Sequence, residues 1–315
     1  MKYIKDLREG TRLTGIYLCK TRQSAMTKNG KPYDNVVLQD KTGTLDGKVW
    51  EPNSAAIEEF EALDYVEIMG DVTTFAGALQ ISIKRARKVG EGEYDPADYL
   101  PASVYDTEQM YQELVQYVES VKNPYLSALL KHYFVEDPEL IKRFKASSAA
   151  KSVHHGFLGG LLEHTLSVTR LCRYFAKAYP ILNYDLLITA AIFHDIGKTR
   201  ELSAFPQNDY TDDGQLLGHI MIGAEMIHDG AAAIDGFPLK LENELKHCIL
   251  AHHGELEYGS PKKPALAEAM ALNLADNADA RLETITELFR TAGDKTDWLG
   301  YNRILESNIR RTGEI

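Results

Sequence analysis

The chain has 315 residues, of which 44% are hydrophobic and 26% are charged, and this length allows two globular domains with separate cores. The chain contains no run of about 18 apolar residues, so no membrane span is predicted. The charged start MKYIKDLREGTRL lacks the apolar core of a secretory signal. The cysteines, Cys19, Cys172 and Cys248, are scattered and odd in number. We therefore expect reduced thiols, a cytoplasmic location and no membrane partner.

The first 90 residues predict a small β-barrel. Five segments rich in Val, Ile, Thr, Tyr and Leu are separated by turn signals, at residues 12–22, 32–39, 44–50, 65–75 and 78–87. A helix is predicted over residues 53–62. Five strands with a helix after the third is the order of the OB-fold, which commonly binds single strands across its second and third strands.

The charge distribution favours this N-terminal part as the place where a nucleic acid binds. The formal net charge is −11, but residues 1–90 carry 14 Lys and Arg against 12 Asp and Glu, whereas residues 91–315 carry 21 against 34. A phosphate backbone is attracted to the more basic part. Cations bound further along the chain would offset some of the acidic excess there.

Binding of a single strand needs aromatic rings beside cations. The rings of this part are Tyr17, Tyr33, Trp50 and Phe75, and the cations are Lys20, Arg22, Lys28, Lys31, Lys48 and Lys84. We expect at least half of the rings to be barrel core. As contacts to the strand we select Tyr33, Trp50, Lys31 and Lys48.

The next segments predict a linker followed by helices. Residues 88–103 contain Gly, Pro and acidic residues, which are typical of a linker. Helical spacing follows through Met110, Leu114, Val118 and Val121, and Pro124 predicts a break before a second helix over residues 125–134. The tail over residues 298–315 is partly apolar, and we expect it to pack against the rest of the chain.

The C-terminal half contains seven side chains of the kinds that bind metals. They are His164, His194, Asp195, His219, His252, His253 and Asp276. Neutral imidazoles and ionised carboxylates bind hard or borderline divalent cations. Four ligands would fill one metal site, whereas seven indicate two metals that share a bridging carboxylate, an arrangement that hydrolyses phosphate esters.

The sequence around these residues places them on or at the ends of helices. His194 and Asp195 end an apolar helical segment just before Gly197, and His252 and His253 end another just before Gly254. Both glycines predict helix stops. Asp276 lies on an otherwise apolar helical face, where a carboxylate needs a partner because a lone buried charge is costly.

This pattern resembles the HD-domain superfamily of metal-dependent phosphohydrolases over roughly residues 150–290. The resemblance rests on His164, the pair His194-Asp195 and Asp276, while His219 and His252-His253 are similar to the dinuclear subgroup. Two strings, HHGFLGGLLEHT at 154–165 and HHGELEYGSPKKP at 252–264, are similar to the bacterial YhaM-type 3′-to-5′ exoribonucleases. Proteins of that type carry an OB-fold before the HD domain.

The resemblance implies a multidomain chain in which a small all-β OB-fold barrel precedes an all-α HD-domain helical fold. The expected parts are the barrel over residues 1–90, a linker and connecting helices over 91–150, the HD domain over 151–295 and a tail over 296–315. The implied activity is 3′-to-5′ hydrolysis of single-stranded RNA. Single-stranded DNA as a substrate and association into a homo-oligomer stay open.

The ligand set and the resemblance together predict the roles of individual residues. Asp195 is the expected bridge, since it can give one oxygen to each of two metals. Lys198 follows one turn after His194 and is expected to hold a phosphate oxygen, with a solvated lysine as an equal alternative. Further candidate substrate contacts are Lys262, Lys263 and Arg281. The resemblance also implies that His154 and His155 lie near the site.

The resemblance implies Mn²⁺ as the metal. The five imidazoles of the ligand set favour transition ions, so iron, nickel, cobalt and zinc also stay open. Magnesium stays open too, although it prefers oxygen ligands.

Two other classes of function stay open as well. One is an HD enzyme that acts on small nucleotides, although an OB-fold would have little use there. The other is a nonenzymatic nucleic-acid-binding factor with a vestigial site, and the complete ligand set argues against it.

Overall fold

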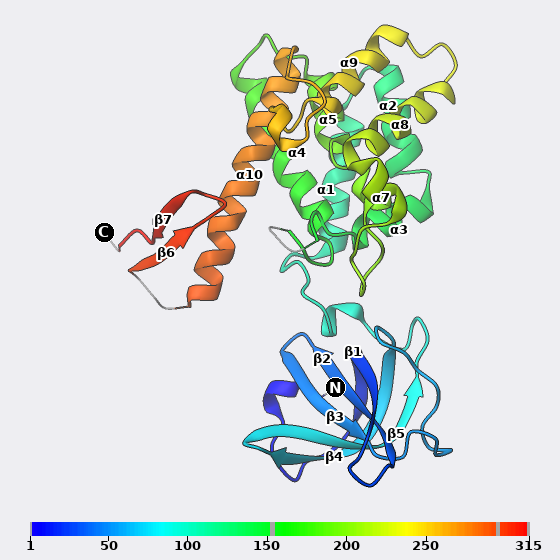
Figure 1. Ribbon diagram of the computed structural model, residues 1–315. Coiled ribbons are helices and arrows are strands. Elements are labelled where there is room, and N and C mark those ends of the chain that lie inside the picture. Colours follow the sequence, from blue (N-terminus) through cyan, green and yellow to red (C-terminus); the bar gives the residue numbers. More distant parts are fainter. Residues whose placement is uncertain (1, 152–154, 294–296, 314–315) are drawn as a thin grey trace. The chain divides into compact units, whose positions relative to one another are not determined.

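The computed structural model describes residues 2–151, 155–293 and 297–313, which belong to two units that divide after Pro101. Figure 1 shows the strands of the first unit and the helices of the second. Each unit has its own hydrophobic core. Within these residues, no helix is long and apolar enough to cross a membrane.

The first unit is a closed barrel of five strands. They are β1 (Arg12–Met26), β2 (Pro32–Asp40), β3 (Gly43–Val49), β4 (Tyr65–Phe75) and β5 (Ala78–Lys88), in the order β1-β2-β3-β5-β4. The pairing of β3 with β5 is parallel, and every other neighbouring pair in the barrel is antiparallel. This is the strand order expected of an OB-fold, so the predicted barrel is confirmed.

The helix predicted over residues 53–62 is wrong. Ile57 forms a parallel bridge with Ala86 of β5, and the backbone of Ala86 donates to the carbonyl of Ala56 and accepts from the N–H of Glu58. Phe60 is buried in the barrel core. The pairing with β5 occupies backbone groups that a helix would pair internally, so tertiary contacts override the local helical spacing.

The expectation that at least half of the four rings are barrel core is also wrong. Tyr17 is fully buried, whereas Tyr33 is half-buried and Trp50 and Phe75 are exposed. The side chain of Tyr17 donates to the backbone carbonyl of Lys2. Three of the four rings therefore retain surface that a ligand can reach.

The segment after β5 packs on the barrel. The ring of Tyr65 stacks on Tyr94 at 3.7 Å between centroids and meets Tyr99 edge-on at 5.1 Å. Gln39 donates to the carbonyl of Tyr99, and Lys41 pairs with Asp98 at 2.8 Å. These contacts account for the extension of the first unit to Pro101.

The second unit is mainly helical. Its α-helices are α1 (Thr107–Ser120), α2 (Pro124–Phe134), α3 (Pro138–Ala146), α4 (Gly160–Ala178), α5 (Tyr184–Phe193), α6 (Lys198–Glu201), α7 (Asp212–Leu216), α8 (Gly218–Ala232), α9 (Leu239–Leu250) and α10 (Ala267–Ala292). The side chains of Asp106, Asn123 and Asp137 cap α1, α2 and α3, which explains where these helices begin. The two helices predicted from the spacing around Met110 and Pro124 are confirmed.

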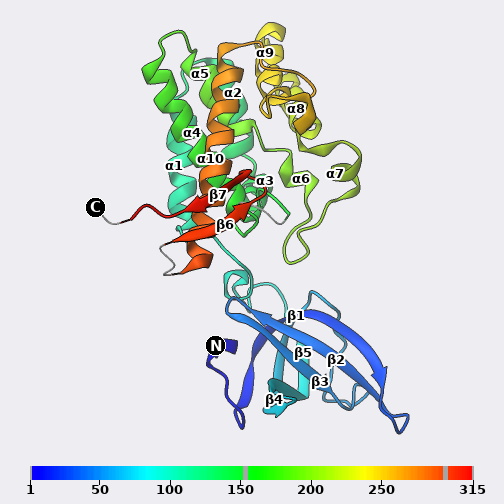
Figure 2. The same ribbon diagram turned by 60° about the vertical axis from the view of Figure 1, so that its left-hand side comes forward.

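Helix α5 lies at the centre of this unit. Every residue from Leu186 to Phe193 is buried. Figures 1 and 2 both show α4, α5 and α10 running alongside one another, and α5 also contacts α9 and α2. A helix buried on all sides fits the uniformly apolar segment that the sequence contains there, and its last residues are thereby held in the interior.

The C-terminal segment forms a hairpin, β6 (Trp298–Asn302) and β7 (Ser307–Arg310), beside the end of α10. The guanidinium of Arg311 donates to the carbonyl of Phe289 and lies 5.0 Å from the centre of its ring. The expectation that the tail packs against the chain is therefore confirmed, with α10 as its partner.

Candidate metal centre

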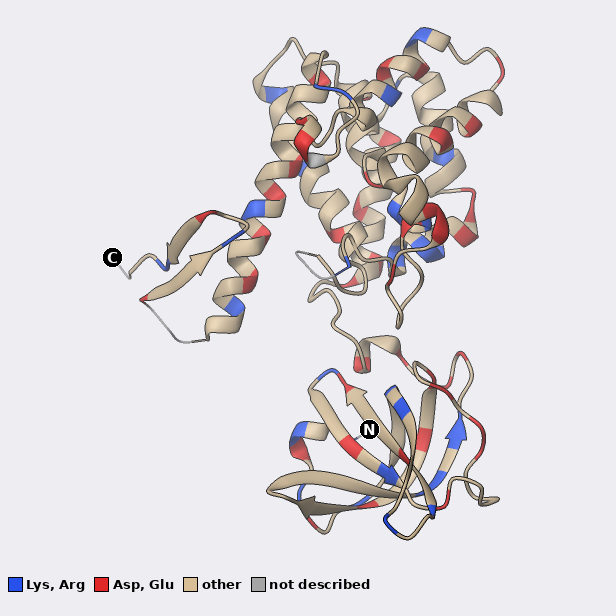
Figure 3. Ribbon diagram, in the orientation of Figure 1, with Lys and Arg blue, Asp and Glu red and all other residues tan. Residues whose placement is uncertain are grey.

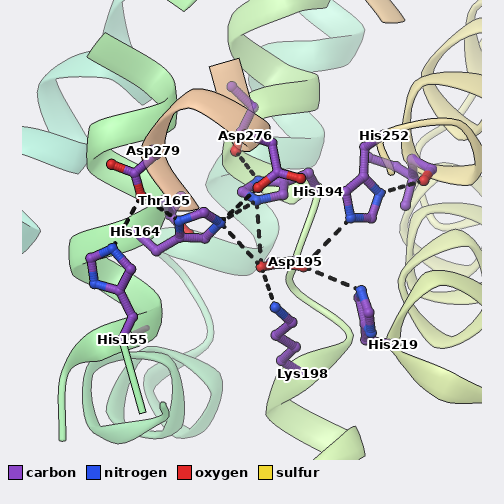
Figure 4. A network of polar contacts seen from close by, with 12 residues as sticks. His155, His164, Thr165, His194, Asp195, Lys198, His219, His252, Asp276 and Asp279 are labelled. Carbon is purple, nitrogen blue, oxygen red and sulfur yellow. Dashed lines mark hydrogen bonds and ion pairs between the residues drawn. The ribbon is translucent and has the colours of Figure 1, made fainter. Parts of the chain in front are cut away.

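The structure brings the seven predicted metal ligands together from five different segments. His164 is on α4, His194 and Asp195 follow α5, His219 is in the first turn of α8, His252 and His253 follow α9, and Asp276 is on α10. Figure 4 shows the side chain of Asp195 in the middle of this group, with imidazoles on both sides.

One group of ligands faces the Oδ2 atom of Asp195. The Nε2 atoms of His164 and His194 lie 3.5 and 3.4 Å from this oxygen. The same two nitrogens are 3.1 Å apart, and Nε2 of His164 is 3.2 Å from Oδ1 of Asp276. His164, His194 and Asp276 each offer a ligand atom within 4.8 Å of the others, so they can share one cation with Asp195.

A second group faces the other oxygen of Asp195. Nε2 of His219 lies 3.4 Å from Oδ1, and Nε2 of His252 lies 3.7 Å from it. His219, His252 and His253 also offer ligand atoms within 4.8 Å of one another. Asp195 therefore stands between two clusters and presents one oxygen to each.

Buried atoms without partners test whether a cation fits here. Oδ1 of Asp195 and the Nε2 atoms of His219 and His252 are buried and have no hydrogen-bond partner among the described residues. Burial of such atoms is costly unless something pairs with them. Because the three atoms face one another, a single divalent ion would pair with all of them, and these donors therefore fit a metal.

Backbone carbonyls fix which nitrogen two of the imidazoles present. Nδ1 of His194 donates to the carbonyl of Ala191 at 2.8 Å, and Nδ1 of His252 donates to the carbonyl of Ile249 at 2.7 Å. The protonated nitrogen is thus turned away, and Nε2 keeps its lone pair for a metal.

Two carboxylates that the sequence analysis missed hold further ligands in place. Oδ2 of Asp279 accepts from Nδ1 of His164 at 2.7 Å, and it also lies 3.1 Å from Nε2 of His155. Oε1 of Glu201 lies 2.9 Å from Nδ1 of His219 and accepts from its backbone N–H. The spacing of Asp276 and Asp279, three residues apart on one helix, could have indicated the first. No local signal indicates Glu201.

The two glycines that were expected to stop helices act differently. Gly254 has φ +80, in the left-handed region typical of a helix stop, as expected. Gly197 has φ −59 and lies in a right-handed turn between α5, which ends at Phe193, and α6, which begins at Lys198. The apolar helix therefore ends near Gly197 as expected, although not through a left-handed glycine. A Cβ atom on Gly197 would lie 2.0 Å from the carbonyl oxygen of His219. Glycine is needed at this position because the start of α8 approaches so closely.

The electrostatics of the centre favour the ionised carboxylates that a cation requires. Burial alone would raise the pKa of Asp195, but Lys198 and His194 hold it well below its usual range. Burial alone would also raise the pKa of Asp276, and the hydrogen bond from His164 lowers it.

The imidazoles of the centre differ in the direction in which their pKa values are shifted. Burial, aided by His253, lowers the pKa of His252 well below its usual value, so this ring is neutral. Burial also acts to lower the pKa of His164, but hydrogen bonds to Asp276 and Asp279 raise it to about 10. Metal binding at His164 therefore displaces a proton.

Lys198 is part of the centre. Its ammonium nitrogen lies 2.7 Å from Oδ2 of Asp195, and its side chain is only 15% exposed. Burial acts to lower the pKa of Lys198, but Asp195 raises it, so the side chain remains a cation. The alternative of a solvated lysine is wrong.

A cavity of about 510 Å³ opens beside these residues. Its lining residues are Ala149, Ala150, Lys151, His164, Asp195, Lys198, Glu201, Leu202, Tyr210, His219, His253, Asn273, Asp276, Asn277 and Ala280. A cavity of this volume has the size of a small-molecule site.

The other predicted substrate contacts of this unit lie outside the cavity lining. Arg281 is adjacent to it, because Nε donates to Oδ1 of Asn277 at 2.7 Å. Lys263 pairs with Glu255 at 2.6 Å, and Lys262 is exposed. His155 reaches the centre through Asp279, whereas His154 lies outside the described residues.

On the barrel, the four predicted strand contacts gather on β2 and β3 and the residues next to them. The rings of Tyr33 and Trp50 are stacked, with centroids 5.3 Å apart and planes at 29°, and Trp50 is 50% exposed. The ammonium of Lys48 lies 5.5 Å from the centre of the Tyr33 ring, and Lys31 is exposed just before β2.

Several other basic residues of the barrel are already paired. Figure 3 shows acidic and basic residues side by side on its strands. Arg22 pairs with Asp34 at 2.6 Å and donates to the carbonyl of Phe60, and Lys84 pairs with Asp71. The Arg22–Asp34 pair is mostly buried and stabilises the barrel, so Arg22 is not available to a phosphate backbone.

Comparison with solved structures finds matches that cover about 27–30% of this chain. The second OB-fold domain of replication protein A from Methanococcus maripaludis is 20% identical over 30% of this chain and 98% of its own, with a TM-score of 0.24. A replication protein A heterotrimer bound to ssDNA is 20% identical over 28% of this chain and 65% of its own, with a TM-score of 0.22. The hypothetical protein ygiW from E. coli is 26% identical over 27% and 82%, with a TM-score of 0.21.

Comparison with protein families matches residues 161–281 to the HD domain. The match includes all seven ligand positions, from His164 to Asp276. HD domains bind divalent metals, and the domain indicates a metal-dependent phosphohydrolase. The chain thus joins a five-stranded barrel with OB-like topology to a helical region that carries an HD domain.

Proposed function

We propose that the protein is a metal-dependent 3′-to-5′ exoribonuclease that shortens single-stranded RNA at a dinuclear HD centre. The observation that carries the proposal is the position of Asp195. Its Oδ2 faces His164 and His194, and its Oδ1 faces His219 and His252. A carboxylate in this position can give one oxygen to each of two cations, an arrangement that supports in-line hydrolysis of a phosphodiester.

Residues around Asp195 would orient the metal ligands and bind the phosphate. Two divalent ions held by these ligands would lower the pKa of a bound water and offset charge on the phosphate oxygens. Asp279 and Glu201 hold His164 and His219 in orientation. Lys198 donates one of its three N–H groups to Asp195 and keeps two for a phosphate oxygen in the cavity that it lines.

Mn²⁺ is the metal that we propose for both positions. Five of the seven ligands are imidazoles, which suit manganese, iron, nickel, cobalt and zinc better than magnesium. We also propose a cytoplasmic location, because the three cysteines are free and buried, as is common in a reducing compartment.

The barrel is proposed to hold the upstream part of the strand. Tyr33 and Trp50 offer a stacked and partly exposed pair of rings, with Lys48 beside Tyr33. Bases stack on such rings with little regard to sequence, and the cations follow the phosphates. Stacking does not read the 2′-hydroxyl, so single-stranded DNA stays open as a second substrate.

A hydrolase of small nucleotides is the second candidate. The cavity of about 510 Å³ has the size of a small-molecule site, which favours it. The exposed Tyr33–Trp50 stack argues against it, because a small nucleotide bound in the helical unit would leave these rings without a role.

A labelled single strand tests the proposal. Protein stripped with a chelator and reloaded with Mn²⁺ is given RNA and DNA strands labelled at the 5′ end. We expect no turnover after stripping, and after reloading a ladder of shortening products that stalls before a stable hairpin. The Asp195→Ala variant should show no turnover with Mn²⁺.

Three outcomes would decide against parts of this function. Immediate release of a labelled 5′ mononucleotide from the intact strand would show that hydrolysis starts at the 5′ end. Cleavage of circular RNA would show a general phosphodiesterase and not an exonuclease. Full turnover by Asp195→Ala would contradict the dinuclear mechanism.

A further inference from the structure

The cavity at the metal centre has a rim built from two loops. One is residues 147–151 after α3, and the other is residues 203–211 between α6 and α7. Leu202 and Tyr210 pair across the base of the second loop, where Ser203 N–H donates to the carbonyl of Asp209 and Thr211 N–H to that of Glu201. The second loop is therefore closed at its base and projects as a defined element.

Asn208 ties the two loops together. Its Oδ1 accepts from the hydroxyl of Ser148 at 2.6 Å, and its Nδ2 donates to the carbonyls of Ala150 and Lys151 at 3.4 and 3.3 Å. Asn208 is buried and has φ +45, a left-handed conformation that asparagine tolerates better than most residues. Strained positions of this kind persist where the surrounding structure holds them, often at ligand sites.

The rim that Asn208 fixes carries an aromatic ring and a cation. Tyr210 is 45% exposed and lines the cavity together with Lys151. The Lys151 ammonium lies 5.7 Å from the centre of the Tyr210 ring and 2.6 Å from a carboxylate oxygen of Asp209. The side chains of this ion pair are 46% and 47% exposed, so it contributes little and an oxyanion can compete for the lysine at low cost.

The residues next to this pair are small or apolar. The cavity lining includes Ala149 and Ala150 from the first loop, Leu202 beside Tyr210, and Ala280 from α10. An apolar surface beside one ring suits a flat aromatic group, and the adjacent ammonium suits a phosphate oxygen. A nucleotide has both groups, whereas a sugar phosphate has no aromatic base and an apolar ligand has no anion.

We propose that Tyr210 and Lys151 make this centre selective for nucleotides. Tyr210 stacks on the base of the nucleotide next to the scissile phosphate, and Lys151 binds the neighbouring backbone phosphate. Asn208 acts as a positioning residue for both. The proposal rests on the proposed function, since it assumes that the phosphate attacked at Asp195 belongs to a nucleic acid strand.

Paired substrates test the role of Tyr210. One RNA strand is intact, and a second lacks the bases of its last two 3′ nucleotides. The ratio of kcat/KM for the intact over the abasic strand should fall about tenfold in Tyr210→Ala, because stacking of one base on a ring contributes an effect of that order. Tyr210→Phe keeps the ring and should keep the ratio. Tyr179→Ala removes another exposed tyrosine, which lies after α4 and outside the cavity lining, and should also keep it.

Binding gives a second readout that needs no turnover. The Mn²⁺-loaded protein is titrated in a calorimeter with adenosine 5′-monophosphate and with ribose 5-phosphate. The nucleotide should bind about tenfold more tightly, and Tyr210→Ala should remove this difference. Lys151→Ala should weaken both ligands, whereas Lys151→Arg should restore them because it keeps the charge.

The outcomes separate this inference from the proposed function. If the protein hydrolyses RNA but Tyr210→Ala leaves the intact-to-abasic ratio and the nucleotide preference unchanged, the inference is overturned and the function stands. If no strand is hydrolysed under any metal, the function fails, and a nucleotide preference that depends on Tyr210 would still support the site.

Discussion

Oδ1 of Asp195 lies 3.4 Å from Nε2 of His219, and both atoms are buried without a hydrogen-bond partner among the described residues. Unpaired buried polar atoms each destabilise a fold by about 1–3 kcal/mol. The folded protein is therefore less stable because two such atoms point at one place in the centre. A cation bound between them would offset that loss.

The first prediction concerns stability and metal. Mn²⁺ at about 100 times its Kd should add about 2.7 kcal/mol to the free energy of unfolding, because it binds the folded state only. Thermal unfolding of stripped and reloaded protein measures this as a rise in Tm. His219→Ala should lose much of the rise, whereas His228→Ala, an exposed histidine paired with Glu242, should keep it. An equal rise in both variants would argue against the second metal position.

The second prediction concerns Asp279. Its carboxylate accepts from Nδ1 of His164, and loss of such a partner typically weakens metal affinity by about 10–100-fold. Asp279→Asn should show that loss when Mn²⁺ binding is measured by calorimetry, with kcat recovering at higher Mn²⁺. Asp71→Asn, which removes a partly exposed carboxylate on the barrel, is the control and should bind Mn²⁺ as the wild type does. Unchanged affinity in Asp279→Asn would exclude the orienting role.

The third prediction concerns the barrel. Trp50→Ala should weaken binding of a long single strand by about 1–3 kcal/mol, since the ring stacks on one base. Lys48→Ala should reduce the dependence of binding on salt, because one phosphate contact is lost. Phe75→Ala removes a ring that is more exposed than Trp50 and is the last residue of β4, and it should bind normally. Fluorescence anisotropy at two salt concentrations measures all three, and equal losses in Trp50→Ala and Phe75→Ala would contradict the assignment.

The fourth prediction concerns pH and thiol reactivity. Burial raises the pKa of Cys19 to about 11 and that of Cys248 to about 12, and it also raises the pKa of Cys172. The reactive thiolate is thus scarce below these values. At pH 8 iodoacetamide should leave the native protein nearly unmodified by mass spectrometry, whereas protein unfolded in urea should gain three labels. Rapid labelling of one cysteine in the native protein would show that its surroundings open.

Much of the architecture followed from local patterns. The five barrel strands are visible as β-branched and aromatic runs between turn signals, and α1 and α2 as helical spacing with Pro124 between them. The helix expected over residues 53–62 failed, because Ile57 and its neighbours pair with Ala86 of β5. A strand more than 20 residues away decides that conformation, and no local pattern contains it.

The sequence by itself determined the chemistry of the centre, because His164, His194-Asp195, His219, His252-His253 and Asp276 are distinctive residue types at helix ends and on a helix face. Only the tertiary structure decided how they work together. It turned the two oxygens of Asp195 to two separate clusters, added Asp279 and Glu201 as partners of His164 and His219, and left Lys262 and Lys263 outside the cavity lining. The physical reason is that ligand identity is a property of single side chains, whereas distance and orientation depend on how α4, α5, α8, α9 and α10 pack.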